Sequence, residues 1–274
     1  MRQLAYCPRY PLGRYIELLW WMEGPPPAHR RERLLPMGTC EIVLVLGNRL
    51  TATAPDLAGE PSERCLVVGA HSEAFVIDPR DTCVLGVHFR PGGAHPFFGL
   101  PTDEVRNRRL PLEALWGRAE VAELEEAIFE DPTPRRCFQL LEAALERRLE
   151  PASGKSQEAL VAQSLALFEG DPQRSIRQTA ADLGVGERRF LSLFRRQVGL
   201  SPKAFRRVRR FQQALRGLAA GRGGAGLADL ALDCGYYDQP HLNHDFRAFT
   251  GVSPGRYLRL KAGLRNLNHL PLED

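Results

Sequence analysis

The sequence predicts an α+β protein in two parts: an N-terminal antiparallel β-barrel with a helical appendix, then a C-terminal all-α domain. Three observations predict this class. Short strand-like runs fill the first hundred residues between closely spaced prolines and glycines, apolar residues then recur at helical spacing, and an internal repeat follows near the end. With 274 residues, the chain has room for two domains.

Five runs of strand-forming residues are expected to form the barrel. They are RYIELLWW, CEIVLVLG, RCLVVGA, AFVID and TCVLGVHF, in that order along the chain. Short strands at this spacing, with no helical pattern between them, are typical of an antiparallel barrel or sandwich.

Helical periodicity begins at Leu112 and predicts a helical pair after the barrel, with Leu141, Leu145 and Leu149 on one apolar stripe. The small and polar segment 150–159 is the natural linker. We therefore divide the chain into a β-rich domain, a helical appendix with linker, and a C-terminal domain. Their predicted bounds are 1–110, 111–155 and 156–274.

Net charge changes sign between the two ends of the chain. Residues 171–274 hold 18 Lys and Arg against 9 Asp and Glu, a net charge of +9, whereas residues 1–170 carry −5. This asymmetry favours a polyanion as the partner of the C-terminal domain. No run approaches the roughly 18 apolar residues of a membrane helix, and the N-terminus lacks the apolar run of a secretory signal. We therefore expect a cytoplasmic protein with no membrane partner.

The C-terminal domain contains one unit twice. FRRQVGLSPKAF at 194–205 matches FRAFTGVSPGRY at 246–257, with Phe, Arg, Gly, Ser and Pro all displaced by 52 positions. Upstream of each copy, a short apolar helix precedes a glycine turn, at Gly184 or Gly235. A tight glycine turn between two helices is typical of the helix-turn-helix motif.

In the first unit, Ser175 is expected to cap the first helix, with Gln178 three positions on completing a capping box. The second helix is expected at about 187–198, with Phe190, Leu193, Phe194 and the stem of Gln197 buried. Its other face is rich in arginine, whose guanidinium groups reach guanine edges and phosphate oxygens in a major groove. The residues predicted to contact DNA on this helix are Arg188, Arg189, Ser192, Arg195 and Arg196.

The second unit repeats this plan with Asp238 as a candidate helix cap and Leu242, Phe246 and Phe249 as the buried stripe. Polar side chains on the other face match base edges and phosphates. The predicted contacts here are Gln239, His241, Asn243, His244 and Arg247, with Lys203 and Arg256 added where a Ser-Pro pair starts the next helix.

His241 and His244 would share a metal only if Asp245 were a third ligand, and no cysteine or glutamate lies nearby, so we interpret these residues as DNA contacts. A helix from Pro202 to Ala220 would be roughly 28 Å long. It would hold the two recognition helices about one duplex turn apart.

At 235–257, the sequence GYYDQPHLNHDFRAFTGVSPGRY resembles the signature of the AraC family of bacterial transcription regulators. The resemblance covers the C-terminal domain and implies a two-unit, seven-helix DNA-binding domain. It also implies double-stranded promoter DNA as the partner and, in many members, RNA polymerase. The first recognition helix departs from the family pattern in its many arginines and in Leu191 on its outer face.

The N-terminal half, through LPMGTCEIVLVLG and GVHFRPGGAHPFFGLPTDEVRNRRLPLEALWG, resembles the β-rich, cupin-like sensor domain of an uncharacterised subgroup of that family. This implies an unidentified small-molecule effector or a homodimer. If alternate residues of the run 83–90 face the interior, His88 and Arg90 would favour an anionic or polar effector; facing solvent is the alternative. Of Trp20 and Trp21, on opposite faces, one should pack in the core, and we assign Trp20 to the pocket.

The favoured function is a sequence-specific DNA-binding transcription regulator, modulated by a small molecule in the N-terminal domain. The alternative is an enzyme, either a cupin-type metalloenzyme or a DNA-repair methyl-acceptor fused to a helix-turn-helix domain. His71, His88 and His95 lack the two-His-plus-Glu spacing of a cupin metal site, and the six cysteines form no C-x-x-C pair. We therefore expect no catalytic residue, no metal and no cofactor.

Overall fold

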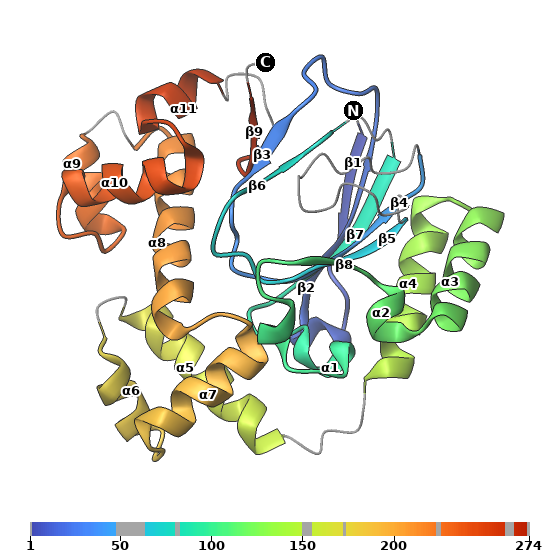
Figure 1. Cartoon of the computed structure of the whole chain (residues 1–274), viewed down its shortest axis with the longest axis horizontal. Helices are drawn as coiled ribbons and strands as arrows, with labels where there is room; N and C mark the ends of the chain where they lie inside the picture. The colour runs from blue at the N-terminus through green and yellow to red at the C-terminus, as the bar shows by residue number, and fades with distance from the viewer. Residues whose placement is uncertain are drawn as a thin grey trace.

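The computed structural model describes residues 2–47, 64–79, 83–149, 155–171, 174–222, 226–260 and 266–272. Sheets lie in the N-terminal half, helices cover one side of them, and a helical C-terminal domain lies on the other side (Figure 1). The strands are β1 (Arg2–Tyr6), β2 (Ile16–Glu23), β3 (Glu32–Leu34), β4 (Glu41–Val45), β5 (Cys65–Val68), β6 (Phe75–Ile77), β7 (Cys83–Phe89), β8 (Arg109–Pro111) and β9 (His269–Pro271).

The α-helices follow β7, with β8 between α1 and α2 and β9 after α11. They are α1 (His95–Phe98), α2 (Glu113–Trp116), α3 (Arg118–Glu130), α4 (Pro134–Arg148), α5 (Lys155–Gly170), α6 (Ile176–Asp182), α7 (Glu187–Val198), α8 (Pro202–Ala219), α9 (Leu227–Asp233), α10 (Gln239–Thr250) and α11 (Pro254–Leu260). Short 3-10 helices are η1 (Leu12–Arg14) and η3 (Thr102–Val105).

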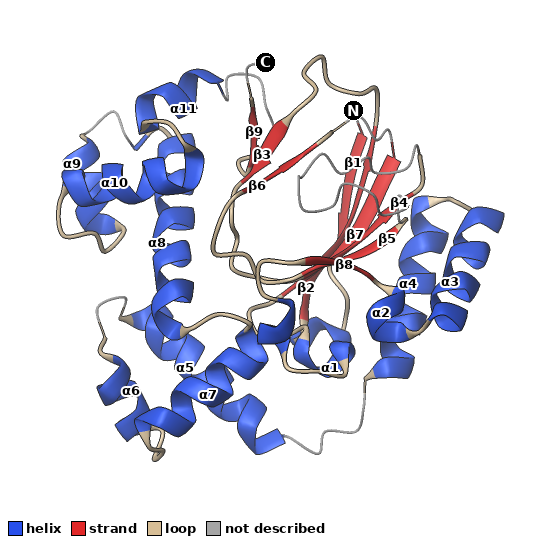
Figure 2. Cartoon of the chain, in the orientation of Figure 1, coloured by secondary structure: helices blue, strands red, loops and turns tan. Residues whose placement is uncertain are grey.

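Antiparallel pairing joins six strands in the order β1-β2-β7-β4-β5-β8, and β6-β3-β9 form a second sheet. The five predicted strands are present as β2, β4, β5, β6 and β7. The α+β class is thus confirmed, with a sheet region first and a helical domain after it (Figure 2).

The prediction of a closed N-terminal barrel was wrong, because β1 and β8 remain at the two edges of the larger sheet in the part of the chain that the structure describes. Residues of β6 pair with β3 instead of joining the row of strands that would close the barrel. The third strand of that small sheet comes from the far end of the chain. Periodicity predicts that a segment is a strand but carries no information about its partner.

One face of the larger sheet is completely buried. Leu19, Ile42, Val67 and Leu85 all have an exposed fraction of 0%. Helices α3 and α4, the predicted helical pair, cover this side of the sheet (Figure 2) and contribute side chains to the same core. Burial of this area supplies most of the hydrophobic stabilisation of the N-terminal half.

The C-terminal domain has two cores, one for each helix-turn-helix unit. The first unit shares a continuous core with the sheet through Phe190, Phe194 and Val198. A separate core holds the second unit through Phe211 and Phe246. Helix α8 runs from one unit to the other (Figure 1), and its 18 residues span about 27 Å.

The end of the chain returns to the N-terminal half through β9. Glu32 on β3 is 6% exposed and lies 2.6 Å from His29 and 2.7 Å from His269 of β9. Burial raises the pKa of Glu32, but the hydrogen bonds and charges of His269 and His29 lower this pKa overall. The Arg33 guanidinium donates to the Thr250 carbonyl. These contacts attach the second unit to the small sheet.

Candidate nucleic-acid interface

Side-chain caps start α6 in the first unit and α10 in the second unit, as the sequence predicts. Ser175 and Gln178 form a complete capping box at α6. Asp238 accepts a hydrogen bond from the His241 backbone N–H at 2.7 Å at the start of α10. The turns between the paired helices use Gly184 and Gly235, with φ of 67° and 78°. Both values lie in the left-handed region that glycine adopts without strain, so the repeated glycine has a common structural cause.

Helix α7 buries one face and exposes the other. Phe190 and Phe194 are 0% exposed and Gln197 is 5% exposed. The ring of Phe194 packs edge-on against Phe168 of α5 and Phe205 of α8, with centroids 5.9 and 5.7 Å apart. The predicted stripe is therefore confirmed, with Leu193 only half-buried at its margin.

All residues predicted to contact DNA from the first unit have exposed side chains: Arg188, Arg189, Ser192, Arg195, Arg196 and Lys203. Four guanidinium groups around one hydroxyl produce a positive surface with many hydrogen-bond donors. Such a surface matches phosphate oxygens and guanine edges.

A groove of about 500 Å³ lies along this exposed face of α7. Its lining residues are Asp103, Glu187, Arg188, Leu191, Ser192, Arg195 and Arg196. Asp103 belongs to η3 in the N-terminal half, and its Oδ1 is buried without a hydrogen-bond partner in the part of the chain that the structure describes. Sequence reasoning missed Asp103, because only the packing of η3 against α7 brings it to the arginines.

Helix α10 buries Leu242 and Phe246 at 0% exposure and Phe249 at 3%, as predicted. His244 and Arg247 are exposed on its opposite face. Arg256, the predicted phosphate contact on α11, is also exposed.

The three other predicted contacts on α10 are half-buried: Gln239, His241 and Asn243. The imidazole of His241 meets the ring of Tyr236 edge-on at 5.1 Å, and its Nδ1 accepts a hydrogen bond from the Tyr237 N–H at 3.4 Å. The outward surface of α10 is therefore narrower than the sequence suggests.

Asp245 points inward, toward α8. It is 4% exposed, and its Oδ1 accepts a hydrogen bond from Nε of Arg207 at 2.9 Å and forms an ion pair with Nη2 of the same guanidinium, also at 2.9 Å. Arg210 lies 3.9 Å from its other oxygen. Asp245 therefore joins α10 to α8, and among the described residues no three His, Cys, Asp or Glu side chains gather where they would hold a metal ion.

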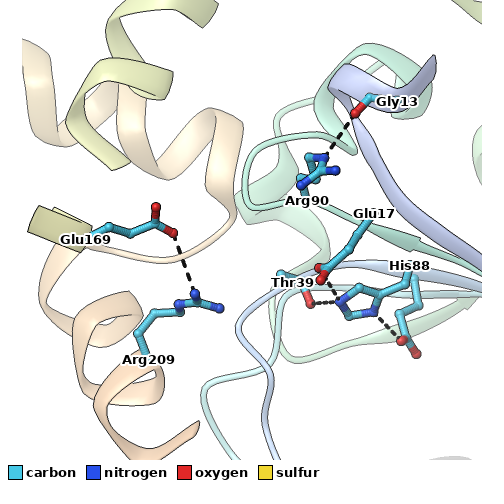
Figure 3. A network of polar contacts seen from close by, with 8 residues as sticks. Gly13, Glu17, Thr39, His88, Arg90, Glu169 and Arg209 are labelled. Carbon is cyan, nitrogen blue, oxygen red and sulfur yellow. Dashed lines mark hydrogen bonds and ion pairs between the residues drawn. The ribbon is translucent and has the colours of Figure 1, made fainter. Parts of the chain in front are cut away.

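The structure brings Trp20 and His88 to one face of the sheet but not Arg90. Trp20 pairs with Gly86, two residues from His88 on β7, so both side chains project from the same side. Arg90 follows the end of β7, is exposed, and its Nε donates to the Gly13 carbonyl at 3.1 Å (Figure 3).

His88 is held by acidic and hydroxyl groups from neighbouring strands (Figure 3). Its Nδ1 lies 2.6 Å from Glu41, and its Nε2 lies 3.3 Å from the Thr39 hydroxyl and 3.6 Å from Glu17. Burial lowers the pKa of His88, but Glu41 and Glu17 raise this pKa overall. His88 is thus already engaged within the protein.

The thiols have the properties of buried apolar side chains. None of the six cysteines forms a disulfide, and only Cys7 is exposed. Burial raises the pKa of Cys40 to about 12 and that of Cys83 and Cys137 to about 11. A reactive thiol needs the opposite shift. Within the described ranges, no helix combines the length and the apolar character that crossing a bilayer requires.

Two family models match the chain. Residues 179–260 match a helix-turn-helix domain, and residues 4–111 match a domain of unknown function, DUF6597. No curated protein matches the chain.

Several solved structures are similar to it. ToxT from Vibrio cholerae O395 is 9% identical with a TM-score of 0.48, over 90% of this chain and 97% of that one. An AraC-type transcriptional regulator from Chromobacterium violaceum is 21% identical, with a TM-score of 0.35 over 41% of this chain and 100% of that one. The C-terminal domain of AraT, a response regulator from Geobacillus stearothermophilus, is 19% identical, with a TM-score of 0.34 over 36% and 84% of the two chains.

The helix-turn-helix match covers most of both repeated units, including the whole of α7 and α10. It agrees with the duplicated turns and with the basic exposed face of α7. Residues 179–260 thus carry a helix-turn-helix domain of the AraC type, which supports a DNA-binding transcription regulator.

Proposed function

We propose that α7 and α10 enter successive major grooves of double-stranded promoter DNA and that their exposed side chains read its sequence. The observation that carries this proposal is the exposure of both helix faces, with Arg188 and Arg195 on α7 and His244 and Arg247 on α10. Helix α8, about 27 Å long, sets the distance between them. Successive major grooves on one side of a duplex are roughly 34 Å apart.

The contacts divide into two kinds under this proposal. Arg188, Ser192, Arg195 and Arg247 lie in the middle of the exposed faces, where they would reach base edges. Lys203 and Arg256 lie in the first turns of α8 and α11, and would bind phosphates beside the N–H groups of those helix starts. The remaining predicted contacts, including the half-buried ones on α10, would position the helices.

The N-terminal half is proposed to modulate DNA binding in response to a small molecule. Two observations support this role: the half-exposed face of its sheet, and the core that it shares with α7. A change in the sheet would therefore reach a recognition helix directly. The division into residues 1–110, 111–155 and 156–274 remains a prediction, as do a homodimer and contact with RNA polymerase.

Selection of bound genomic fragments, followed by sequencing, identifies the operator. Fluorescence anisotropy on that site then tests the assignment, with Arg188→Ala and Arg247→Ala as variants. Arg136→Ala is the matched control, since Arg136 is exposed on α4 and far from both recognition helices (Figure 1).

We expect each recognition-helix variant to weaken operator binding by about 1–3 kcal/mol, or roughly fivefold to 150-fold, while the control binds like the native chain. Equal affinity of all four proteins for the operator would contradict the proposed contacts.

A further inference from the structure

The sheet face opposite the helices α3 and α4 is only half-buried. Residues that lie directly opposite each other on neighbouring strands share a face. One such row is Pro111, Leu66, Val43, Gly86 and Trp20, across five strands. Apart from Gly86, which is buried, these side chains are half-exposed, whereas the residues of the other face are completely buried. This row forms an apolar surface that the described residues leave partly open.

A charged row runs beside this apolar row on the same face. Arg109 lies opposite Val68, Val68 opposite Glu41, and Glu41 opposite His88. The two rows are two residues apart along each strand, or roughly 7 Å. A single small molecule would therefore span both rows.

Among the residues that the structure describes, none supplies a counter-charge to the positive end of this row. Arg109 is half-buried, and its guanidinium lies over the ring of Phe75 from β6, 4.8 Å from the centroid. Among the described residues it makes no ion pair and no hydrogen bond. Stacking on a ring uses the flat face of the guanidinium and leaves its N–H groups free in the plane. Burial lowers the pKa of Arg109, which shows that water compensates its charge only in part.

Glu41, the acidic residue of the row, is already bound to His88 at 2.6 Å. It lies two strands away from Arg109, or about 10 Å between the backbones. It therefore does not neutralise the guanidinium.

His71 adds a second unsatisfied group beside Arg109. It is 7% exposed, and its ring packs against Phe75 with centroids 4.4 Å apart. Its Nε2 is buried and has no hydrogen-bond partner in the described part of the chain. Burial lowers the pKa of His71 to about 4, with Arg109 adding to the shift, so the imidazole is neutral at pH 7. A neutral imidazole with its hydrogen on Nε2 donates one hydrogen bond to an acceptor.

The ring of Phe75 thus contacts the half-buried guanidinium of Arg109 and the buried, unsatisfied imidazole of His71, next to a half-exposed apolar surface. We propose that this site binds a small monocarboxylate with an apolar body, the carboxylate on Arg109 and His71 and the body over Val43, Leu66 and Trp20. A carboxylate satisfies a guanidinium through two parallel hydrogen bonds. The inference rests on the proposed role of the N-terminal half as the ligand-binding part, and it assigns that ligand's chemical class.

Octanoate and phenylacetate are suitable probes, because they share the carboxylate and differ in an aliphatic or aromatic body. Octanamide is the matched neutral control. Binding to the full-length chain is measured by isothermal titration calorimetry without DNA. These measurements are independent of the operator, so a failure of DNA binding does not affect them.

We expect saturable binding of at least one carboxylate and at least tenfold weaker binding of octanamide than of octanoate. Arg109→Gln should weaken carboxylate binding at least tenfold, and His71→Phe by a smaller factor. Arg106→Gln, an exposed residue three positions away, should leave it unchanged.

The comparison of octanoate with octanamide needs no variant, so the proposal is testable even if Arg109→Gln does not fold. Binding of neither carboxylate, equal binding of acid and amide, or undiminished binding by a folded Arg109→Gln variant would overturn the proposal.

Discussion

Asp245→Asn tests whether the acidic residue beside His244 belongs to the structure or to the binding surface. The substitution keeps the shape of the side chain and removes its charge. In the native chain, Oδ1 accepts a hydrogen bond of 2.9 Å from Nε of Arg207 and forms an ion pair of 2.9 Å with its Nη2, and Arg210 lies 3.9 Å from Oδ2. Loss of the charge weakens the hydrogen bond and the ion pair by about 1 kcal/mol each.

Solvent reduces this loss, because the Arg207 side chain is 40% exposed while that of Asp245 is 6% exposed. We therefore expect the free energy of unfolding to fall by about 1 kcal/mol rather than 2. For a chain of this size, that corresponds to a decrease in Tm of about 2–4 °C. Differential scanning fluorimetry measures it, and the double variant with Arg207→Gln should show non-additive losses.

His244→Ala is the matched control on the same helix, since its side chain is 80% exposed. It should leave Tm unchanged and weaken operator binding, whereas Asp245→Asn should lower Tm and, well below Tm, bind the operator with native affinity. An unchanged Tm together with lost DNA binding in Asp245→Asn would refute the structural role.

Three further predictions concern the interface and the attachment of its second unit. Lys203→Ala should reduce the slope of log affinity against log salt by about 0.9, as measured by anisotropy from low to high salt, and an unchanged slope would show that Lys203 meets no phosphate. Asp103→Asn removes a negative charge from the groove on α7, so operator binding should tighten up to about fivefold; weaker binding would mean that Asp103 itself contacts DNA. Burial raises the pKa of Glu32, but His269 and His29 lower this pKa overall. The ionised Glu32 therefore stabilises the fold fully when the pH is above 4.5, the ordinary pKa of a glutamate, and this stabilisation is lost as the pH falls through the lower pKa of the folded state. Glu32→Gln should therefore lower Tm above pH 4.5 and matter less below it, and the opposite trend in a pH series of melting curves would contradict this.

Much of the interface was predictable from sequence because local rules determine it. The caps Ser175 and Asp238 and the turns at Gly184 and Gly235 depend only on neighbouring residues, and the structure confirms all four. The same holds for the buried stripe of α10.

Other features depend on tertiary contacts that no local pattern carries. Strand β9 pairs with β3 across more than two hundred residues, and Asp103 meets α7 only because η3 packs there. Asp245 points inward because it binds Arg207 on α8, and the position of Arg207 relative to α10 cannot be predicted from local sequence. The barrel prediction failed for the same reason, since strand partners are set by the whole fold.

Insertion of 5 base pairs between the two half-sites of the operator tests the central claim most directly. Two recognition helices held by the rigid helix α8 read two grooves on one side of the duplex, and about half a helical turn moves the second half-site to the other side. The account predicts that binding falls to the level of a single half-site in an anisotropy titration. Insertion of about 10 base pairs should not restore it, because the rigid α8 cannot span one more turn of the duplex. Native affinity for the operator with 5 inserted base pairs would contradict simultaneous reading by α7 and α10.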